Sequence, residues 1–254
     1  MLRRTFLHVP GIGPTTERAL WADGITTWGE YLDRPSRIRA AERAQARAAV
    51  EESVRRYEAG DWAYFERSLS HAAKWRAFGE LGARAVYLDI ETDGSLSNVT
   101  IVGLYDGANL RTFIAGRDLG DAVDCLEAAS LLVSYNGAGF DLPVLRRAFP
   151  RMTLRAIHLD LLYPLRRLGY RGGLKAIEGR MGIRRSGETV GLDGWDAVRL
   201  WREAQAGSNS AMETLIAYNA EDVRNLEPLA RHVYRCGLEE FERAAGPVAG
   251  GGRS

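Results

Sequence analysis

The 254-residue sequence predicts an α/β fold, in which a mixed sheet is flanked by helices and preceded by a helical appendage. Residues 1–80 have helical patterns, residues 85–114 contain apolar β-prone runs joined by turns, and the chain beyond them is mostly helical. Strands and helices in this order form one layered unit. We expect a helical region over residues 1–80, an α/β domain over 84–245 and a disordered glycine-rich tail over 246–254.

The composition, with 46% hydrophobic and 26% charged residues, is that of a globular protein and excludes disordered and collagen-like chains. We find no apolar run with the length of a signal peptide or a membrane span. Cys125 and Cys236 form neither a CxxC pair nor a disulfide framework, which favours a reducing compartment. We therefore expect a cytoplasmic protein without a membrane partner.

The charges are distributed unevenly although the net charge is only +1. Residues 89–145 contain 2 basic and 9 acidic residues, whereas residues 146–185 contain 11 basic and 2 acidic residues. A basic block can be a solvated helical face, but beside an acidic cluster it is typical of a track for phosphate groups. Almost all of its members are arginines, which bind phosphate in a bidentate manner. The distribution favours a nucleic-acid partner.

The region over residues 1–80 is expected to consist of several helices. One begins near Pro14 and ends before Gly24, because proline is favoured at helix starts and glycine after helix ends. An Ala/Arg/Glu-rich helix follows over 35–58, and a break is expected at Gly60. The aromatic-rich segment 61–80 is interpreted as core against the following domain rather than as a surface that stacks on bases.

The following segments alternate between β-prone runs and turn residues. The turn Asp106–Asn109 lies between two such runs and predicts a hairpin within a β-meander. The expected elements are the strands 85–91, 98–105, 110–114 and 131–135 and the helix 118–128.

Two carboxylates, Asp89 and Glu91, stand at the end of the first expected strand. Because side chains alternate along a strand, residues i and i+2 point to the same face. Two buried like charges need a cation, and hard divalent cations take carboxylate oxygens. A solvated strand end is the alternative, but the apolar run before the pair and the turn Thr92–Ser95 after it favour the metal site.

Two further constellations contain acidic residues. Asp141 follows the run 135–140, in which an apolar strand breaks at glycines and a helix begins, and taken alone it is interpreted as a helix N-cap. Tyr218 and Asp222 are four residues apart in the helical run 212–234 and therefore share one face. Alone, this pair would be a surface acid beside a half-buried tyrosine. Together with Asp89 and Glu91, these residues predict a single catalytic site.

The order and spacing of these residues resemble the DEDD superfamily of proofreading-type 3′–5′ exonucleases on the ribonuclease H-like fold. The resemblance spans residues 84–234, and Asn136–Asp141 is similar to the second motif of that group. Ala217 and Tyr218 stand five and four residues before Asp222, so there is no histidine at either position and the tyrosine branch (DEDDy) is favoured over the histidine branch. The run Gly172–Glu178 and the helical N-terminal region are similar to a prokaryotic subgroup of ribonuclease H-like-domain proteins.

The resemblance implies a metal-dependent 3′–5′ exonuclease that hydrolyses single-stranded nucleic acid, DNA in preference to RNA, to nucleoside 5′-monophosphates. It implies two Mg²⁺ or Mn²⁺ ions, with Asp89 bridging both. Glu91 and Asp222 would complete the ion that holds the attacking water, and Asp141 would help to hold the second ion. The Tyr218 hydroxyl would orient the water, because an ordinary tyrosine pKa of about 10 makes it a poor base.

Other residues are expected to contact the substrate or to support the site. Asn136 and Phe140 stand where the terminal nucleotide lies in the family pattern, although both could shape the turn and the core. Lys175, preceded by two glycines, is expected to contact a substrate phosphate. For Asp160, support of the metal site and a buried hydrogen-bonded acid both stay open, whereas His158 is interpreted as structural.

The segment Val9–Gly13 resembles the hairpin of a helix-hairpin-helix motif, whose turn presents N–H groups to a phosphate. Only eight residues precede it, too few for a full first helix, so nucleic-acid contact and packing both stay open. The functional alternatives are a structure-specific endonuclease or ribonuclease on the same fold, and a nucleic-acid binding protein without catalysis. The presence of all four carboxylates counts against the last. The sequence does not fix the oligomeric state, and a homo-oligomer is compatible with it.

Overall fold

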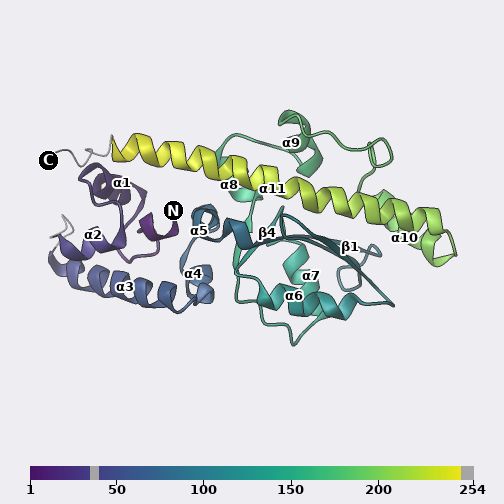
Figure 1. Cartoon of the computed structure of the whole chain (residues 1–254), viewed down its shortest axis with the longest axis horizontal. Helices are drawn as coiled ribbons and strands as arrows, with labels where there is room; N and C mark the ends of the chain where they lie inside the picture. The colour runs from purple at the N-terminus through teal and green to yellow at the C-terminus, as the bar shows by residue number, and fades with distance from the viewer. Residues whose placement is uncertain (35–39, 247–254) are drawn as a thin grey trace.

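A five-stranded sheet with helices on both faces adjoins a helical N-terminal region in the computed structural model, which describes residues 1–34 and 40–246 (Figure 1). This arrangement confirms the predicted fold class, a mixed sheet flanked by helices. From residue 247 onward, the expected disordered tail lies outside the described residues.

The N-terminal region begins its first long helix at Pro14, and Gly24 follows that helix with a positive φ of 76°. The next helix begins with a capping box, in which Thr27 and Glu30 satisfy each other's backbone N–H groups. The helix expected over 35–58 is described from Ala40 onward. The helices are α1 (Pro14–Ala22), α2 (Trp28–Asp33), α3 (Ala40–Glu58), α4 (Trp62–Ser68) and α5 (Phe78–Leu81), with the 3-10 turns η1 (Leu2–Arg4), η2 (Lys74–Ala77) and η3 (Gly82–Arg84).

The aromatic-rich segment 61–80 contributes to the core, as the sequence predicts. Phe65, Trp75 and Phe78 are buried in a cluster that also contains residues of the sheet. In the hairpin-like segment near the N-terminus, Val9 and Ile12 are likewise buried. Packing therefore accounts for the apolar residues of both segments.

The sheet has the strand order β3-β2-β1-β4-β5. The first three strands are antiparallel neighbours, whereas β4 and β5 run parallel to β1. The predicted hairpin at Asp106–Asn109 is present. A strand at 157–160 was not predicted, because its alternation of apolar and polar residues extends over only four positions. The strands are β1 (Ala85–Thr92), β2 (Val99–Tyr105), β3 (Leu110–Ile114), β4 (Leu131–Ser134) and β5 (Ile157–Asp160).

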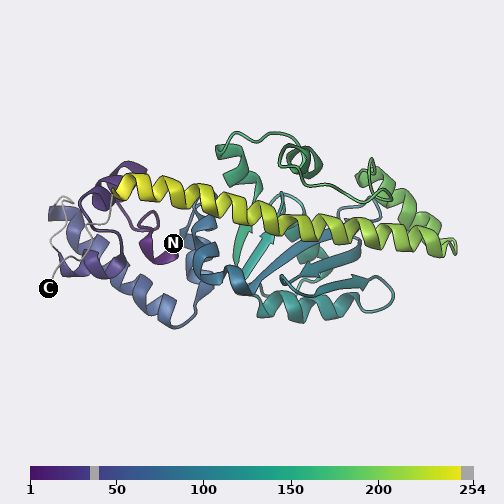
Figure 2. The same cartoon turned by 45° about the horizontal axis from the view of Figure 1, so that its top comes forward.

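Helices cover both faces of the sheet (Figures 1 and 2). Leu88 and Ile90 of β1 pack against α6 and α7, whereas Ala85 and Tyr87 face the cluster that includes α11. Phe140 is the N-cap of α7, so Asp141 is its first helical residue rather than the expected cap. The elements are η4 (Leu119–Asp121), α6 (Ala122–Ala128), α7 (Asp141–Ala148), α8 (Leu162–Arg167), α9 (Leu174–Arg180), α10 (Gly194–Gln205) and α11 (Asn209–Ala245).

Helix α11 has 37 residues and runs along both the sheet and the N-terminal region (Figure 2). Glycines allow this helix to approach its neighbours closely. A Cβ atom at Gly103 of β2 would overlap the Asn219 side chain, and one at Gly237 would overlap Trp75. The backbone of β2 therefore lies directly under the part of α11 that contains Asn219.

Within residues 1–34 and 40–246, we find no helix that is long and apolar enough to cross a membrane.

Candidate metal centre

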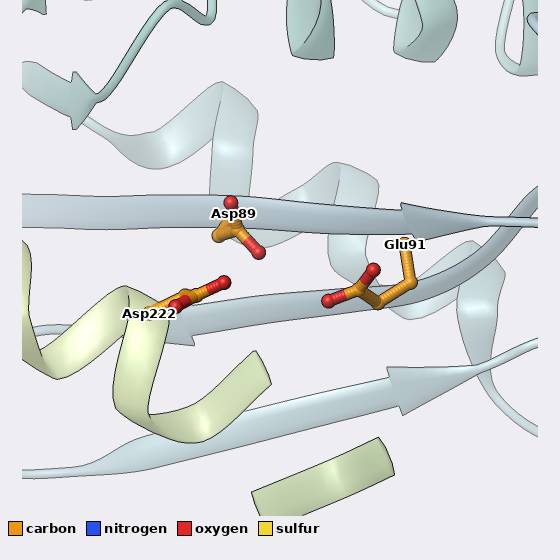
Figure 3. Close-up of side chains that lie close together, drawn as sticks. All are labelled: Asp89, Glu91 and Asp222. Atoms are coloured by element: carbon orange, nitrogen blue, oxygen red, sulfur yellow. The ribbon is translucent and has the colours of Figure 1, made fainter. Parts of the chain in front are cut away.

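Three carboxylates converge where β1 meets α11. Asp89 and Glu91 continue the face of β1 that Ala85 and Tyr87 begin, because alternate residues of a strand share a face. Asp222 lies on α11 and faces them across the sheet surface (Figure 3). One carboxylate oxygen of each residue lies within 4.8 Å of the others. The structure thus brings together three of the four carboxylates that the sequence singled out.

The fourth carboxylate, Asp141, lies close to this group but outside the 4.8 Å cluster. It is buried at the first turn of α7, on the element that follows β4. Its charge raises the pKa of both Asp89 and Glu91, so the three groups share one electrostatic environment. Asp141 is therefore a neighbour that can hold an ion beside the main cluster.

Burial raises the pKa of every carboxyl group in this environment. The pKa of Asp89 lies well above its ordinary value because of burial and of the nearby Asp222 and Glu91. Burial and Asp222 raise the pKa of Glu91 to about 8. For Asp222, burial again raises the pKa, and the Arg185 guanidinium opposes this effect. Burial and mutual repulsion thus disfavour the ionised forms of these carboxyl groups, and a bound cation would favour them.

The donor set fits a hard divalent cation. All of the converging ligand atoms are carboxylate oxygens, the atoms that Mg²⁺ and Mn²⁺ prefer. Glu91 Oε1 is buried and has no hydrogen-bond partner among the described residues, so it is free to bind an ion.

Asn219 fixes Asp89 from the neighbouring helix, a role that the sequence analysis did not assign. Its Nδ2 donates to Asp89 Oδ2 at 2.9 Å and to the Asp89 carbonyl at 3.4 Å. Asn219 is fully buried and passes directly over Gly103, which pairs with Asp89 in the sheet. Its position between Tyr218 and the acidic residues that follow was the only local signal.

Arg185 also belongs to the site, although the sequence assigned it to the basic block. Its guanidinium donates to Asp222 and, at 2.7 and 2.8 Å, to both oxygens of Glu178. Asn225 on α11 donates to the same Glu178 carboxylate at 3.1 Å. The Arg185 side chain is only 7% exposed, so this arginine balances internal carboxylates rather than extending a surface track for phosphate.

Tyr218 lies beside the carboxylates, and Lys175 holds its hydroxyl. Lys175 Nζ donates to Tyr218 Oη at 2.9 Å and lies 4.4 Å from the centre of the tyrosine ring. Burial and the charges of Asp222, Glu91 and Asp89 raise the pKa of Tyr218, so its hydroxyl stays protonated. The geometry permits the hydroxyl to donate to a third group while it accepts from Lys175.

A cleft of about 200 Å³ opens over the carboxylates. Phe140 lines it, whereas Asn136 is exposed and does not belong to the lining. Asp160 accepts from the backbone N–H groups of Asn136 and Ala138, and so holds the loop that leads to Phe140. His158 bonds to the Ser134 hydroxyl, in agreement with a structural role. The lining residues are Asp89, Ile90, Glu91, Thr92, Phe140, Gly194, Val198, Tyr218 and Asp222.

A comparison with protein families agrees with this architecture. A family model described as RNase H superfamily matches residues 86–234. The structure of a family B DNA polymerase from the hyperthermophilic archaeon Pyrobaculum calidifontis is similar over 65% of this chain, with 21% sequence identity and a TM-score of 0.48. The matched part covers 27% of the polymerase chain. Among curated proteins, no sequence matches.

Proposed function

Since this chain belongs to the RNase H superfamily, we propose that it is a metal-dependent nuclease and, more narrowly, a 3′–5′ exonuclease of the DEDDy group. The observation that carries the proposal is the convergence of Asp89, Glu91 and Asp222 at a cleft, with Tyr218 beside them. Membership of the superfamily makes this cluster a candidate for phosphodiester hydrolysis. The substrate would be single-stranded DNA, with RNA as the second choice, and the products would be nucleoside 5′-monophosphates. We keep a cytoplasmic location as a prediction.

In this proposal, the carboxylates hold two Mg²⁺ or Mn²⁺ ions. Asp89 would contact both, Glu91 and Asp222 would complete one site, and Asp141 would support the other. When bound, such ions lower the pKa of water and offset the charge that develops on the attacked phosphate. Asn219 keeps the Asp89 carboxylate in a fixed orientation, because its amide occupies one carboxylate oxygen.

Tyr218 and Lys175 would act on the attacking water and the phosphate. The protonated Tyr218 hydroxyl can hold a water oxygen by donating to it, so it would orient the water rather than remove its proton. Lys175 carries a positive charge next to that hydroxyl, where it can contact a phosphate oxygen as well. Phe140 borders the same cleft and would contact the terminal nucleotide. Asn136 would reach the substrate only from the rim.

The test is hydrolysis of 5′-labelled single-stranded DNA and RNA with Mg²⁺, with Mn²⁺ and with chelator. We expect a metal-dependent ladder that shortens from the 3′ end, faster for DNA, and a loss of at least about 10³-fold in Asp89→Ala and Asp222→Ala. Glu213→Ala, which removes an exposed residue of α11 away from the cleft lining, should cleave like the wild type.

Other outcomes would replace the proposal. Internal cuts that persist when the 3′ end is blocked would indicate a structure-specific endonuclease. If the metal-loaded wild type cleaves neither strand but retains both, a binding protein without catalysis would be the correct description.

A further inference from the structure

Exposed apolar side chains gather around the cleft. Leu96, Val190 and Trp195 are 58%, 63% and 78% exposed. They are not part of the cleft lining themselves, but Thr92 before Leu96 and Gly194 beside Trp195 are. On the described part of the chain, Tyr163 is the one other exposed large apolar side chain, and it is only 37% exposed. Single exposed apolar residues are normal, but a group of them beside a polar site indicates a binding surface.

Trp195 is the second residue of α10, whose start is fixed by a capping box between Asp193 and Asp196. Gly194 before it and Val198 after it both line the cleft. Residues three apart on a helix are surface neighbours, so Trp195 and Val198 share one flank of α10. The indole therefore stands at the rim of the cleft and is not covered by the rest of the protein.

Two loops complete this rim. The loop that contains Leu96 follows β1, and an added Cβ at its Gly94 would lie 3.5 Å from a methyl carbon of Val198. The loop that contains Val190 is anchored on α11, because Thr189 donates to Glu221, the neighbour of Asp222. The three apolar side chains thus stand on three segments that meet at the carboxylate site.

The charges around the rim favour bases over phosphates. Asp193 and Asp196 flank Trp195, and both interact electrostatically with Lys175, which holds Tyr218 inside the site. Asp196 is also paired with Arg199 at 3.3 Å, so Asp193 is the flanking carboxylate that would repel a phosphate group from the indole, whereas Lys175 would attract one. A strand in the cleft would therefore direct its backbone toward Lys175 and its bases toward Trp195.

We propose that Trp195, supported by Leu96 and Val190, forms a stacking surface for unpaired bases at the 3′ end of a single strand. This inference rests on the proposed function and names the residue that would select single-stranded ends. Bases stack on aromatic side chains without sequence preference, and such contacts tolerate any base. Inside a duplex the faces of each base are covered by the neighbouring pairs, so unpaired bases offer the indole far more stacking surface than paired ones.

The test is binding, measured by fluorescence anisotropy with Ca²⁺ in place of Mg²⁺ or Mn²⁺. The probes are a 5′-labelled oligothymidine of about ten nucleotides and an equally long strand with abasic sites at its 3′ end. We expect Trp195→Ala to weaken binding of oligothymidine about ten-fold and to leave binding of the abasic strand unchanged. Trp195→Phe should restore most of the affinity. The control Tyr163→Ala, which removes an exposed aromatic of α8, an element with no residue in the cleft lining, should bind both probes like the wild type.

Two outcomes would overturn the inference. One is a Trp195→Ala variant that has an unchanged melting temperature and binds both strands with the affinity of the wild type. The same holds if this variant loses equal affinity for the oligothymidine and for the abasic strand. The other is a dimeric wild type whose Trp195→Ala variant is monomeric by light scattering and unaltered in strand binding, which would make the rim a self-association surface. Cleavage is measured separately. A wild type that shows the expected binding but no hydrolysis would reject the proposed nuclease and leave the stacking surface standing.

Discussion

At the residue scale, Arg185 sets the charge balance of the carboxylate site. It pairs with Asp222 and Glu178, and all three side chains are nearly inaccessible to water. Removing one partner of a buried ion pair leaves an uncompensated charge, which is costly. Arg185 thus supports a site whose other members repel one another.

Replacing Arg185 tests this role. Arg185→Met should destabilise the metal-free protein by about 3–5 kcal/mol, because two buried carboxylates lose their cation. Added Mn²⁺ should then raise the melting temperature more in the variant than in the wild type, because the ion replaces the missing charge. The stability of Arg185→Lys and its Mn²⁺-induced rise in melting temperature should lie between those of the wild type and of Arg185→Met, since lysine keeps the charge without the forked geometry. Thermal melting with chelator and with Mn²⁺ measures both effects. An equal metal-induced shift in all three proteins would contradict the role.

The raised pKa of Glu91 predicts how the stability of the folded protein depends on pH. Its pKa is raised to about 8 in the folded protein, so folding favours the protonated form. Between its ordinary pKa and about pH 8, the folded state binds more protons than the unfolded state, and the contribution of Glu91 to stability falls as pH rises. The amide of Glu91→Gln cannot ionise.

The metal-free Glu91→Gln variant should therefore become progressively more stable than the wild type as pH rises from about 5 to about 8.5, by roughly 1–3 kcal/mol at the upper end. Urea unfolding of both proteins over this range measures the difference. Burial also lowers the pKa of His8 and His158, but both proteins share these groups, so their titration cancels. A difference that does not change with pH would show that Glu91 is already ionised in the folded state.

At the scale of elements, the close approach between α11 and β2 determines where Asp222 lies. A Cβ at Gly103 would overlap both Asn219 and Val223 on the helix, so the helix must shift to admit it. Gly103→Ala should cost about 1–3 kcal/mol of stability and, if the proposed function holds, should reduce hydrolysis as well.

Gly237→Ala provides the comparison, because its overlap with Trp75 lies at the other end of α11. It should lower stability by a similar amount and affect hydrolysis less. Gly179→Ala in α9 is the control, since its Cβ would meet no atom within 4 Å, and it should be neutral or slightly stabilising. Denaturant unfolding and cleavage assays on the three variants measure these effects. Equal losses of activity at Gly103 and Gly237 would contradict a local role for the β2 contact.

The residues that sequence reasoning found are those that local periodicity places. Asp89 and Glu91 share a strand face, and the period of a helix brings Tyr218 and Asp222 together, so each pair was predictable on its own. Asn219 reaches Asp89 across 130 residues, and Arg185 reaches Asp222 across 37 residues from a segment outside the helices and strands. Such contacts depend on how elements pack, which no short-range pattern specifies. Strand β5 was missed for a different reason, because its alternation of apolar and polar residues covers only four positions, and all four residues are buried.

At the scale of the whole molecule, the N-terminal region and the sheet share one core. Trp21 packs edge-on against Phe241 of α11, and Glu66 of α4 accepts from the backbone of β5 at 2.7 Å. Within the N-terminal region, Glu17 of α1 and Arg76 of η2 form a buried ion pair at 2.6 Å. Because these contacts are continuous, we expect the chain to unfold as one cooperative unit.

Glu17→Gln tests this cooperativity. Loss of the charge partner of Arg76 should lower the stability of the whole chain by about 3–5 kcal/mol, seen in calorimetry as one peak that moves to lower temperature. Glu203→Gln breaks the exposed pair with Arg199 and should cost less than about 0.5 kcal/mol. A second peak that stays in place, while the first one moves, would show that the sheet is stable without the N-terminal region.

The position of α11 in the chain has a consequence for synthesis. Residues 209–245 leave the ribosome after every other described element, since proteins are made from the N-terminus onward. Until they emerge, Asp89 has neither Asn219 nor Asp222 beside it, and the apolar faces of β1 and of the N-terminal helices have no helix to cover them. The nascent chain would therefore hold these surfaces open until α11 has emerged, and its carboxylate site can form only then.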